Sequence, residues 1–170
     1  MQWAQKQKGF TIVELLIVVV VIAILATITV VAYNGIRQRT ETAAQESDLV
    51  TYQKAILAAR NNTGLVLRYI TGSTYSLNPC VSAGSNPSAL EPRELPTSHA
   101  CWTTYYANLT AIGNAANMNL DGLRKGDFRG NPYGLDENEG ETCGNDQIFT
   151  FNGSGISRTI RVNVPRVAVC

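Results

Sequence analysis

One long apolar stretch near the N-terminus restricts what this chain can fold into. From Phe10 to Tyr33 the sequence is apolar except for Thr11, Glu14, Thr27 and Thr29. As a helix, these 24 residues would extend about 36 Å, enough to cross a hydrocarbon core of about 30 Å. No second run of this kind follows in the sequence. We therefore expect one membrane-spanning helix, residues 10–33, and a water-exposed remainder.

Glu14 is unexplained by the two commonest kinds of N-terminal segment. A secretory signal has an apolar core of about 7 to 15 residues, shorter than the run seen here. A simple signal anchor fits the length, and Lys6 and Lys8 would hold its N-terminus in the cytoplasm. Neither gives a reason for a carboxylate in an apolar helix, which costs roughly 2.5–3.5 kcal/mol at the bilayer centre. Glu14 is therefore predicted to be functional and to have a partner.

The segment K-G-F-T-I-V-E-L-L-I, residues 8–17, resembles the N-terminal signature of type IV pilins and of the pseudopilins of type II secretion. The resemblance covers residues 1–33 and includes the basic leader, the Gly–Phe junction, the position of Glu14 and the length of the apolar run. It implies that a membrane-embedded prepilin peptidase cuts between Gly9 and Phe10, removes residues 1–9 and methylates the new amino terminus.

The same resemblance implies how subunits assemble. The amine created at Phe10 would pair with Glu14 of a neighbouring subunit in a helical filament of identical or related pilins. Losing one partner of a buried ion pair costs roughly 3–5 kcal/mol, so the pair would select one axial stagger among many apolar ones. The implied partners also include membrane lipid before assembly and an inner-membrane assembly platform. The head would lie outside the cytoplasm, and then on an extracellular filament.

Two positions depart from the family pattern. Many pilins have Gly midway along the anchor and Pro near its end, where this chain has Ala23 and Val31. Neither residue breaks a helix as Gly or Pro does. We therefore expect a straighter stalk, or melting driven only by the β-branched run at residues 27–31.

The helix is expected to continue beyond Tyr33, with residues 34–62 forming its amphipathic half. An apolar face recurs at three- and four-residue steps, at Leu49, Tyr52, Ile56 and Ala59. The residues assigned to the solvent face are Gln45, Glu46, Asp48, Gln53, Lys54 and Arg60. The sequence N-N-T-G at residues 61–64 predicts the end of the helix. The predicted fold is α+β, with a helix from Thr11 to Arg60 packed on a small antiparallel sheet.

Residues 63–170 are expected to form the globular head. Residues 65–96 are predicted to be loop with at most one strand, at 66–70, because Pro, Gly and Ser are frequent there. Residues 102–109 favour a strand, and residues 109–123 a short helix. A hairpin is predicted from strands at 147–151 and 156–164, because they flank the sequence N-G-S-G.

The four cysteines of the chain, Cys80, Cys101, Cys143 and Cys170, all follow the apolar run. An even number behind a membrane-targeting segment favours disulfides, and the spacings match no zinc signature. Four cysteines allow three pairings. Nearness in sequence and the resemblance to pilin heads favour Cys80 with Cys101 and Cys143 with Cys170.

A weaker resemblance suggests a metal. The sequence D-F-R-G-N-P-Y at residues 127–133 resembles the D-x-x-G-N-P-Y segment found before the final strands of major pseudopilins and of many Gram-positive-type pilins. In pseudopilins the loop that follows this segment holds calcium. This implies calcium ligands at Asp136, Glu139 and Asp146, which supply the hard oxygens that calcium takes. The alternative is a solvated acidic turn. No other cofactor is expected.

The sequence favours a structural role over catalysis or nucleic-acid binding. We find no nucleophile–base constellation and no phosphate-binding loop, and His99 is the one histidine. The charge is near balance, with 14 basic and 13 acidic residues, so a nucleic-acid partner would need a local cluster such as Arg158, Arg161 and Arg166. The expected function is a major or minor type IV pilin supporting adhesion, twitching motility or DNA uptake. The alternatives are a secretion pseudopilin and a membrane-anchored binding or enzymatic domain with a fortuitous leader match.

Overall fold

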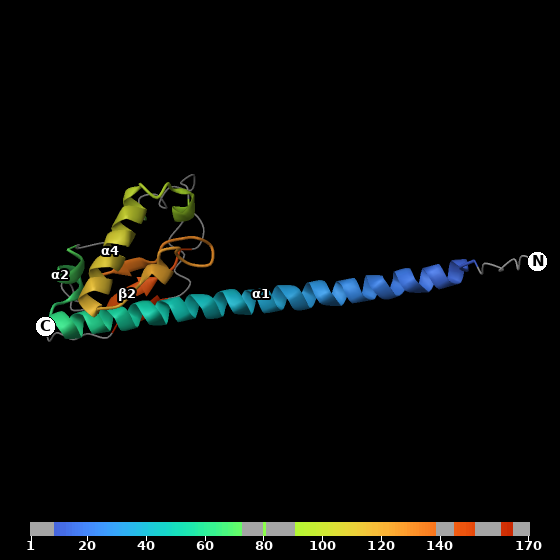
Figure 1. The fold of residues 1–170 in the computed structure, drawn as a ribbon, viewed down its shortest axis with the longest axis horizontal. Helices are drawn as coiled ribbons and strands as arrows, with labels where there is room; N and C mark the ends of the chain where they lie inside the picture. Colours follow the sequence, from blue (N-terminus) through green and yellow to red (C-terminus); the bar gives the residue numbers. More distant parts are fainter. Residues whose placement is uncertain (1–8, 73–79, 81–90, 139–144, 152–160, 165–170) are drawn as a thin grey trace, which may run out of the picture. The chain divides into compact units, whose positions relative to one another are not determined.

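The structure, a computed structural model, describes residues 9–72, 80, 91–138, 145–151 and 161–164. The chain divides into two compact units, Met1–Thr42 and Ala43–Cys170, which we describe separately. The elements along the chain are α1 (Ile12–Thr63), α2 (Leu67–Thr71), the 3-10 helix η1 (Pro92–Glu94), α4 (Ala100–Ala116), the 3-10 helix η2 (Asp121–Leu123), β1 (Gly134–Asp136), β2 (Asp146–Phe149) and β3 (Arg161–Val164) (Figure 1).

Helix α1 is unbroken from Ile12 to Thr63, and the prediction of one long helix is confirmed. The threonines in its apolar part bond to the helix itself, since the Thr27 hydroxyl donates to the Ala23 carbonyl at 2.8 Å. The helix passes through Ala23 and Val31 without a break. It ends at Gly64, which has a positive φ of 68° and donates its N–H to the Arg60 carbonyl at 2.7 Å.

The unit Ala43–Cys170 has its own core, to which the second half of α1 contributes. All four residues predicted to form the apolar face, at positions 49, 52, 56 and 59, are buried there with side chains from α2, α4 and the three strands. Two residues predicted to face solvent, Gln45 and Arg60, are instead buried. Arg60 is buried because Asp146 of β2 supplies a counter-charge inside the head.

The sheet has the order β1-β2-β3 and both pairings are antiparallel, so the α+β prediction is confirmed. Ile148 lies opposite Leu135 on one side and Val162 on the other. The predicted pairing of the last two strands is also confirmed. The register joins Phe149 to Arg161, and residues 156–160 of the predicted second strand lie outside the described residues. The N-G-S-G sequence itself lies outside the described residues.

Two local predictions for the head are wrong, and a third is right only in part. Residues 102–109, predicted as a strand, lie in α4, because Trp102, Tyr105, Leu109 and Ile112 recur at helical spacing and are all buried. Burial of this face outweighs the strand preference of its aromatic residues. Residues 66–70 likewise contribute to the short helix α2 and not to a strand. The predicted helix at 109–123 is replaced by the end of α4 at Ala116 and by η2.

A disulfide joins Cys80 to Cys101, the first of the two expected pairs, with a Cα–Cα distance of 4.7 Å. Both cysteines pack with Phe149 and Phe151 in a second buried cluster. The bond therefore fastens the first turn of α4 beside β2. The other expected pair involves residues 143 and 170, which lie outside the described residues.

Candidate functional site

The first turn of α1 is closed by a reciprocal capping interaction between Thr11 and Glu14. One carboxylate oxygen of Glu14 accepts from the Thr11 backbone N–H and from the Thr11 hydroxyl, both at 2.9 Å. The Thr11 hydroxyl oxygen in turn accepts the Glu14 backbone N–H at 3.2 Å. This arrangement is a capping box, which satisfies backbone donors that a helix start leaves open. The sequence analysis missed it, although the T-x-x-E spacing is its usual signal.

The predicted cleavage position lies just before this turn. Gly9 and Phe10 precede the helix, and Phe10 is 87% exposed. A side chain added at Gly9 would meet no atom within 4 Å. The peptide bond between them is therefore outside helical hydrogen bonding and sterically open, as a substrate of an endopeptidase needs to be. The cleavage itself stays a prediction.

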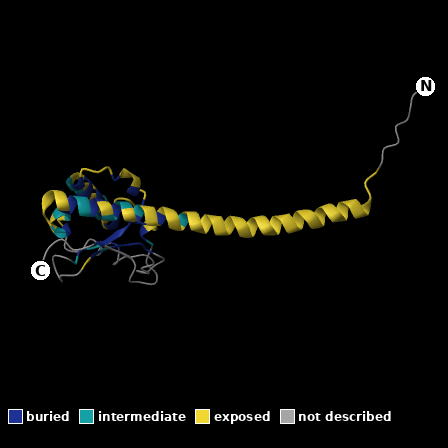
Figure 2. Ribbon diagram, turned by 90° about the horizontal axis from the view of Figure 1, so that it is seen from below, coloured by how far each residue is buried: buried dark blue, intermediate teal, exposed yellow. Residues whose placement is uncertain are grey.

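The apolar part of α1 is exposed along its length (Figure 2). Its large apolar side chains from Phe10 to Ile36 have exposed fractions between 48% and 87%. Within the part of the chain that the structure describes, α1 is the one helix long and apolar enough to cross a membrane. An apolar surface of this extent is expected to be covered by lipid or by other helices.

Glu14 is the one acidic residue within this exposed apolar segment, residues 10–36. Its capping bonds use one of the two carboxylate oxygens, so the other remains available to a second donor. An amine from another chain could thus bind Glu14 while the cap stays closed. The structure contains one chain, so the predicted pairing of Glu14 with a neighbour's Phe10 amine stays a prediction.

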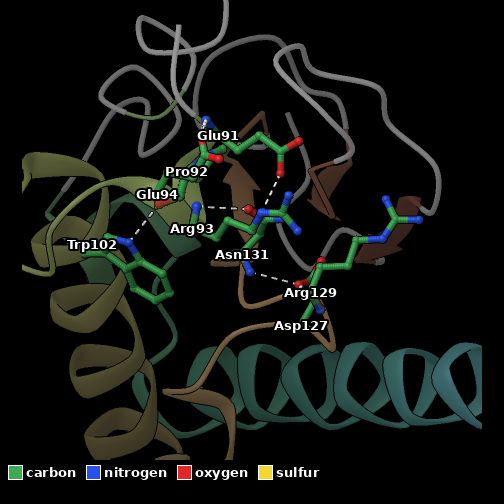
Figure 3. Close-up of polar contacts among 8 residues, drawn as sticks. All are labelled: Glu91, Pro92, Arg93, Glu94, Trp102, Asp127, Arg129 and Asn131. Atoms are coloured by element: carbon green, nitrogen blue, oxygen red, sulfur yellow. Dashed lines mark hydrogen bonds and ion pairs between the residues drawn. The ribbon is translucent and has the colours of Figure 1, made fainter.

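Within the head, the turn at residues 127–133 is built around Asp127 (Figure 3). One oxygen of its buried carboxylate accepts the backbone N–H groups of Arg129 and Asn131, at 2.9 and 2.8 Å. Burial raises the pKa of the Asp127 carboxyl above its ordinary value, and these backbone hydrogen bonds only partly offset that. The Asn131 side chain carries the network onward by accepting the Arg93 backbone N–H at 3.0 Å. The turn is therefore held to η1 by hydrogen bonds.

Two further contacts fasten the turn to its surroundings. The Trp102 indole donates to the Pro92 carbonyl at 2.9 Å, which fixes η1 against α4 (Figure 3). The Tyr133 hydroxyl donates to the Asp48 carboxylate of α1 at 2.9 Å, and burial raises the pKa of Tyr133. The D-x-x-G-N-P-Y segment thus joins η1, α4 and the second half of α1 in one head.

The predicted calcium ligands are only partly described. Asp146 is 1% exposed and forms a buried ion pair with Arg60. Asp136 lies in β1, and Glu139 is outside the described residues. Among the described residues no group of three or more His, Cys, Asp or Glu side chains could hold a metal ion. Asp146 therefore fits a partner of Arg60 better than a calcium ligand, and the calcium site stays a prediction.

Comparison with known proteins finds a match to one family model, over a short N-terminal part of the chain. Residues 4–30 match the family model described as the prokaryotic N-terminal methylation motif. This span includes the predicted cleavage position, the capping turn with Glu14 and most of the apolar segment. The comparisons with curated proteins and with solved structures found no match.

Proposed function

We propose that this chain, which carries the N-terminal methylation signature of type IV pilins and pseudopilins, is a major or minor pilin of a type IV pilus. It would polymerise through residues 10–36 of α1 and present the head on the filament surface for adhesion, twitching motility or DNA uptake. A prepilin peptidase would release residues 1–9 and methylate Phe10. An inner-membrane platform would then move the subunit from lipid into the filament. This is a structural role and needs no catalytic site.

One observation carries the proposal: a single carboxylate, Glu14, lies within the exposed apolar segment, residues 10–36, in the first turn of α1. Moving such helices from lipid into a filament exchanges lipid contacts for van der Waals contacts between helices, and this packing fixes no register by itself. A charge that must meet an opposite charge does fix the register, because a misplaced neighbour leaves both groups unpaired. The match at residues 4–30 supports the same conclusion, because that motif marks chains whose new N-terminus is methylated.

Two substitutions separate the charge of Glu14 from its capping role. Glu14→Gln keeps an oxygen that can accept from Thr11, since Gln serves in capping boxes, but it removes the charge. Thr11→Val keeps the charge but removes the hydroxyl from both of its capping bonds. Glu46→Gln, an exposed position on the same helix, is the control. We expect Glu14→Gln to abolish filaments, and Thr11→Val and Glu46→Gln to retain them.

Filaments would be sheared from cells, quantified by immunoblot and examined by electron microscopy. The N-terminus of each variant would be sequenced, because unprocessed chains would fail to assemble for a different reason. A processed Glu14→Gln chain that forms filaments at the wild-type level refutes charge pairing as the basis of assembly. A wild-type chain that retains residues 1–9 in cells with a prepilin peptidase supports instead a membrane-anchored binding domain.

The turn at residues 127–133 favours one alternative, a pseudopilin of type II secretion. This turn is a well-connected part of the head, and the sequence that forms it resembles a pseudopilin segment. The absence of Pro at position 31 points the same way. Labelling the head on intact cells distinguishes the two, since a pilus presents it on long surface filaments and a pseudopilus keeps it in a short periplasmic one.

A further inference from the structure

An open cavity of about 470 Å³ lies at the C-terminal end of α4, within the head. Leu109 and Gly113 of α4 line it on one side, and Leu120 lines it from the segment that follows the helix. A cavity of this size falls within the range of small-molecule sites, about 300–1,000 Å³. Neither the disulfide nor the apolar segment of α1 contributes to it.

The cavity walls are held by the way in which α4 ends. Asn117 adopts the left-handed conformation, with φ 54° and ψ 43°, and its N–H bonds to the carbonyl of Asn114. The Met118 N–H donates to the Gly113 carbonyl at 2.9 Å. A side-chain carbon at Gly113 would lie 2.9 Å from the Met118 carbonyl oxygen, so only glycine lets the chain turn back this closely. The cavity is therefore built by backbone geometry.

The charged groups at the rim neutralise each other. Arg124 bonds to the Asp121 carboxylate at 3.1 Å and to the Thr110 hydroxyl at 3.0 Å. Its guanidinium also lies over the ring of Tyr106, 5.5 Å from the centroid. The arginine is thus fixed in position and paired with an acid. A site without net charge offers little to a phosphate or another anion, which would need an unpaired cation.

Side-chain amides supply the unused hydrogen-bonding capacity. Six of the ten lining residues are polar, and three of these are asparagines. Asn119 accepts the Asp121 N–H at 2.7 Å and keeps its two amide hydrogens. The exposed amides of Asn114 and Asn117 make no side-chain hydrogen bond within the part of the chain that the structure describes. Each amide presents a donor and an acceptor side by side, which matches adjacent hydroxyl groups that both donate and accept.

We propose that this cavity binds a neutral saccharide of one or two sugar units, such as the end of a glycan chain. The rim has no net charge, the walls are predominantly polar, and the free groups are amides suited to vicinal hydroxyls. An apolar peptide side chain would bind better in an apolar pocket, whereas most residues that line this cavity are polar. The site goes beyond filament formation, and it would serve a pilin and a pseudopilin alike.

The test uses the full chain in a detergent without sugar groups, because a glycoside detergent would itself occupy the cavity. Saturation-transfer NMR would be recorded with the methyl glycosides of glucose, galactose, mannose and N-acetylglucosamine, and with inorganic phosphate. A ligand of about a dozen non-hydrogen atoms with few polar contacts binds in the millimolar range. We expect saturable binding of at least one glycoside at about 1–10 mM and no competition by phosphate.

Matched variants connect the binding to this cavity. Asn117→Gly removes an amide but retains the left-handed conformation, which glycine adopts freely. Asn61→Ala removes an exposed amide from the last turn of α1, away from the cavity lining, and is the control. We expect Asn117→Gly to weaken binding about tenfold, the scale of one lost hydrogen-bond contribution, and Asn61→Ala to leave it unchanged.

The proposal is overturned if no glycoside binds below about 50 mM, far above the expected range, or if both variants bind as well as the original chain. It is also overturned if phosphate displaces the glycoside. Loss of filaments in Asn117→Gly with unchanged glycoside binding would assign the cavity to a subunit contact. Filament assembly by Asn117→Gly with weakened binding supports the saccharide site and leaves the proposed function intact.

Discussion

The buried ion pair between Arg60 of α1 and Asp146 of β2 makes a demanding prediction about the head. Both side chains are 1% exposed, so their charges are removed from water together. Asp146→Ala would leave the guanidinium buried without this counter-charge, which costs roughly 3–5 kcal/mol. Domains of this kind are stable by only about 5–15 kcal/mol, so the loss would be large. Asp136→Ala is the control, because Asp136 is a half-buried acid of the neighbouring strand β1. It should change the free energy of unfolding by less than about 1 kcal/mol.

Urea unfolding followed by tryptophan fluorescence measures this difference. The processed chain would contain one tryptophan, Trp102, because Trp3 belongs to the predicted leader. Trp102 is 6% exposed and lies in the core of the head, so its emission reports on that unit. The free energy of unfolding falls by about 1–3 kcal/mol for each molar of urea, so Asp146→Ala should lower the urea concentration at the unfolding midpoint by about 2 M.

Two further measurements complete the experiment. One is the stability of the double variant Arg60→Met, Asp146→Leu, and the other is the effect of Asp146→Ala with and without calcium. Replacing a buried pair with apolar residues of similar size is often neutral, so the double variant should regain most of the lost stability. If Asp146 acts through Arg60, its substitution should have the same effect in calcium and in chelator. A loss below about 1 kcal/mol for Asp146→Ala, equal to that for Asp136→Ala, refutes the buried pair. A loss that appears only with calcium refutes it in favour of the metal site.

Three other predictions concern the turn and the disulfide. Gly126→Ala should destabilise the head by at least about 2 kcal/mol, because φ is +76° and the new carbon would lie 2.2 Å from a backbone oxygen; Gly122→Ala, with open space around it, should stay within about 1 kcal/mol in the same urea assay. Replacing Cys80 and Cys101 with serine should cost about 3 kcal/mol for a loop of 21 residues' separation. Reductant should lower the stability of the original chain. Any effect of reductant on the chain with serine at both positions would arise from the other two cysteines. Burial raises the folded-state pKa of Asp127 above 3.8, so the head should lose stability as pH rises from 3.8 through that raised value. Asp127→Asn should lack this loss, which the difference between its pH–stability curve and that of the original chain measures. An unchanged pH dependence in that variant would mean that the carboxyl is not desolvated.

The features predicted well from the sequence have local signals. The apolar face at Leu49, Tyr52 and Ile56 follows the helical period. Length and composition alone predict a helix long and apolar enough to cross a membrane, and α1 is such a helix. Even where the prediction failed, at Trp102 and Tyr105, the helical spacing was present. Intrinsic strand preference was weighed above that spacing, whereas the buried face of α4 decided the structure.

The features that the sequence could not supply depend on residues far apart in the chain. Arg60 looks like a solvent-facing residue on an amphipathic helix, and only Asp146, 86 residues away, makes its burial tolerable. Asp48 and Tyr133, separated by 85 residues, are a second case. The fold must form before such partners meet, so no spacing rule predicts them. Glu14 differs in kind, because the sequence places it in an apolar segment and its carboxylate forms no ion pair among the described residues.

Polar residues with partners in the head, such as Arg60 and Asp48, lie in the second half of α1, whereas Glu14 lies in its exposed apolar part. From Ile12 to Ala44 no side chain of the helix is buried, whereas from Gln45 onward one face is buried in the head. A substitution between Ile12 and Ala44 thus changes no buried side chain of α1, and we expect it to act on membrane insertion or assembly before folding. A substitution at Leu49, Tyr52 or Arg60 acts on folding first. The same helix therefore has two kinds of surface, an exposed apolar one that includes Glu14 and a face that is buried in the head.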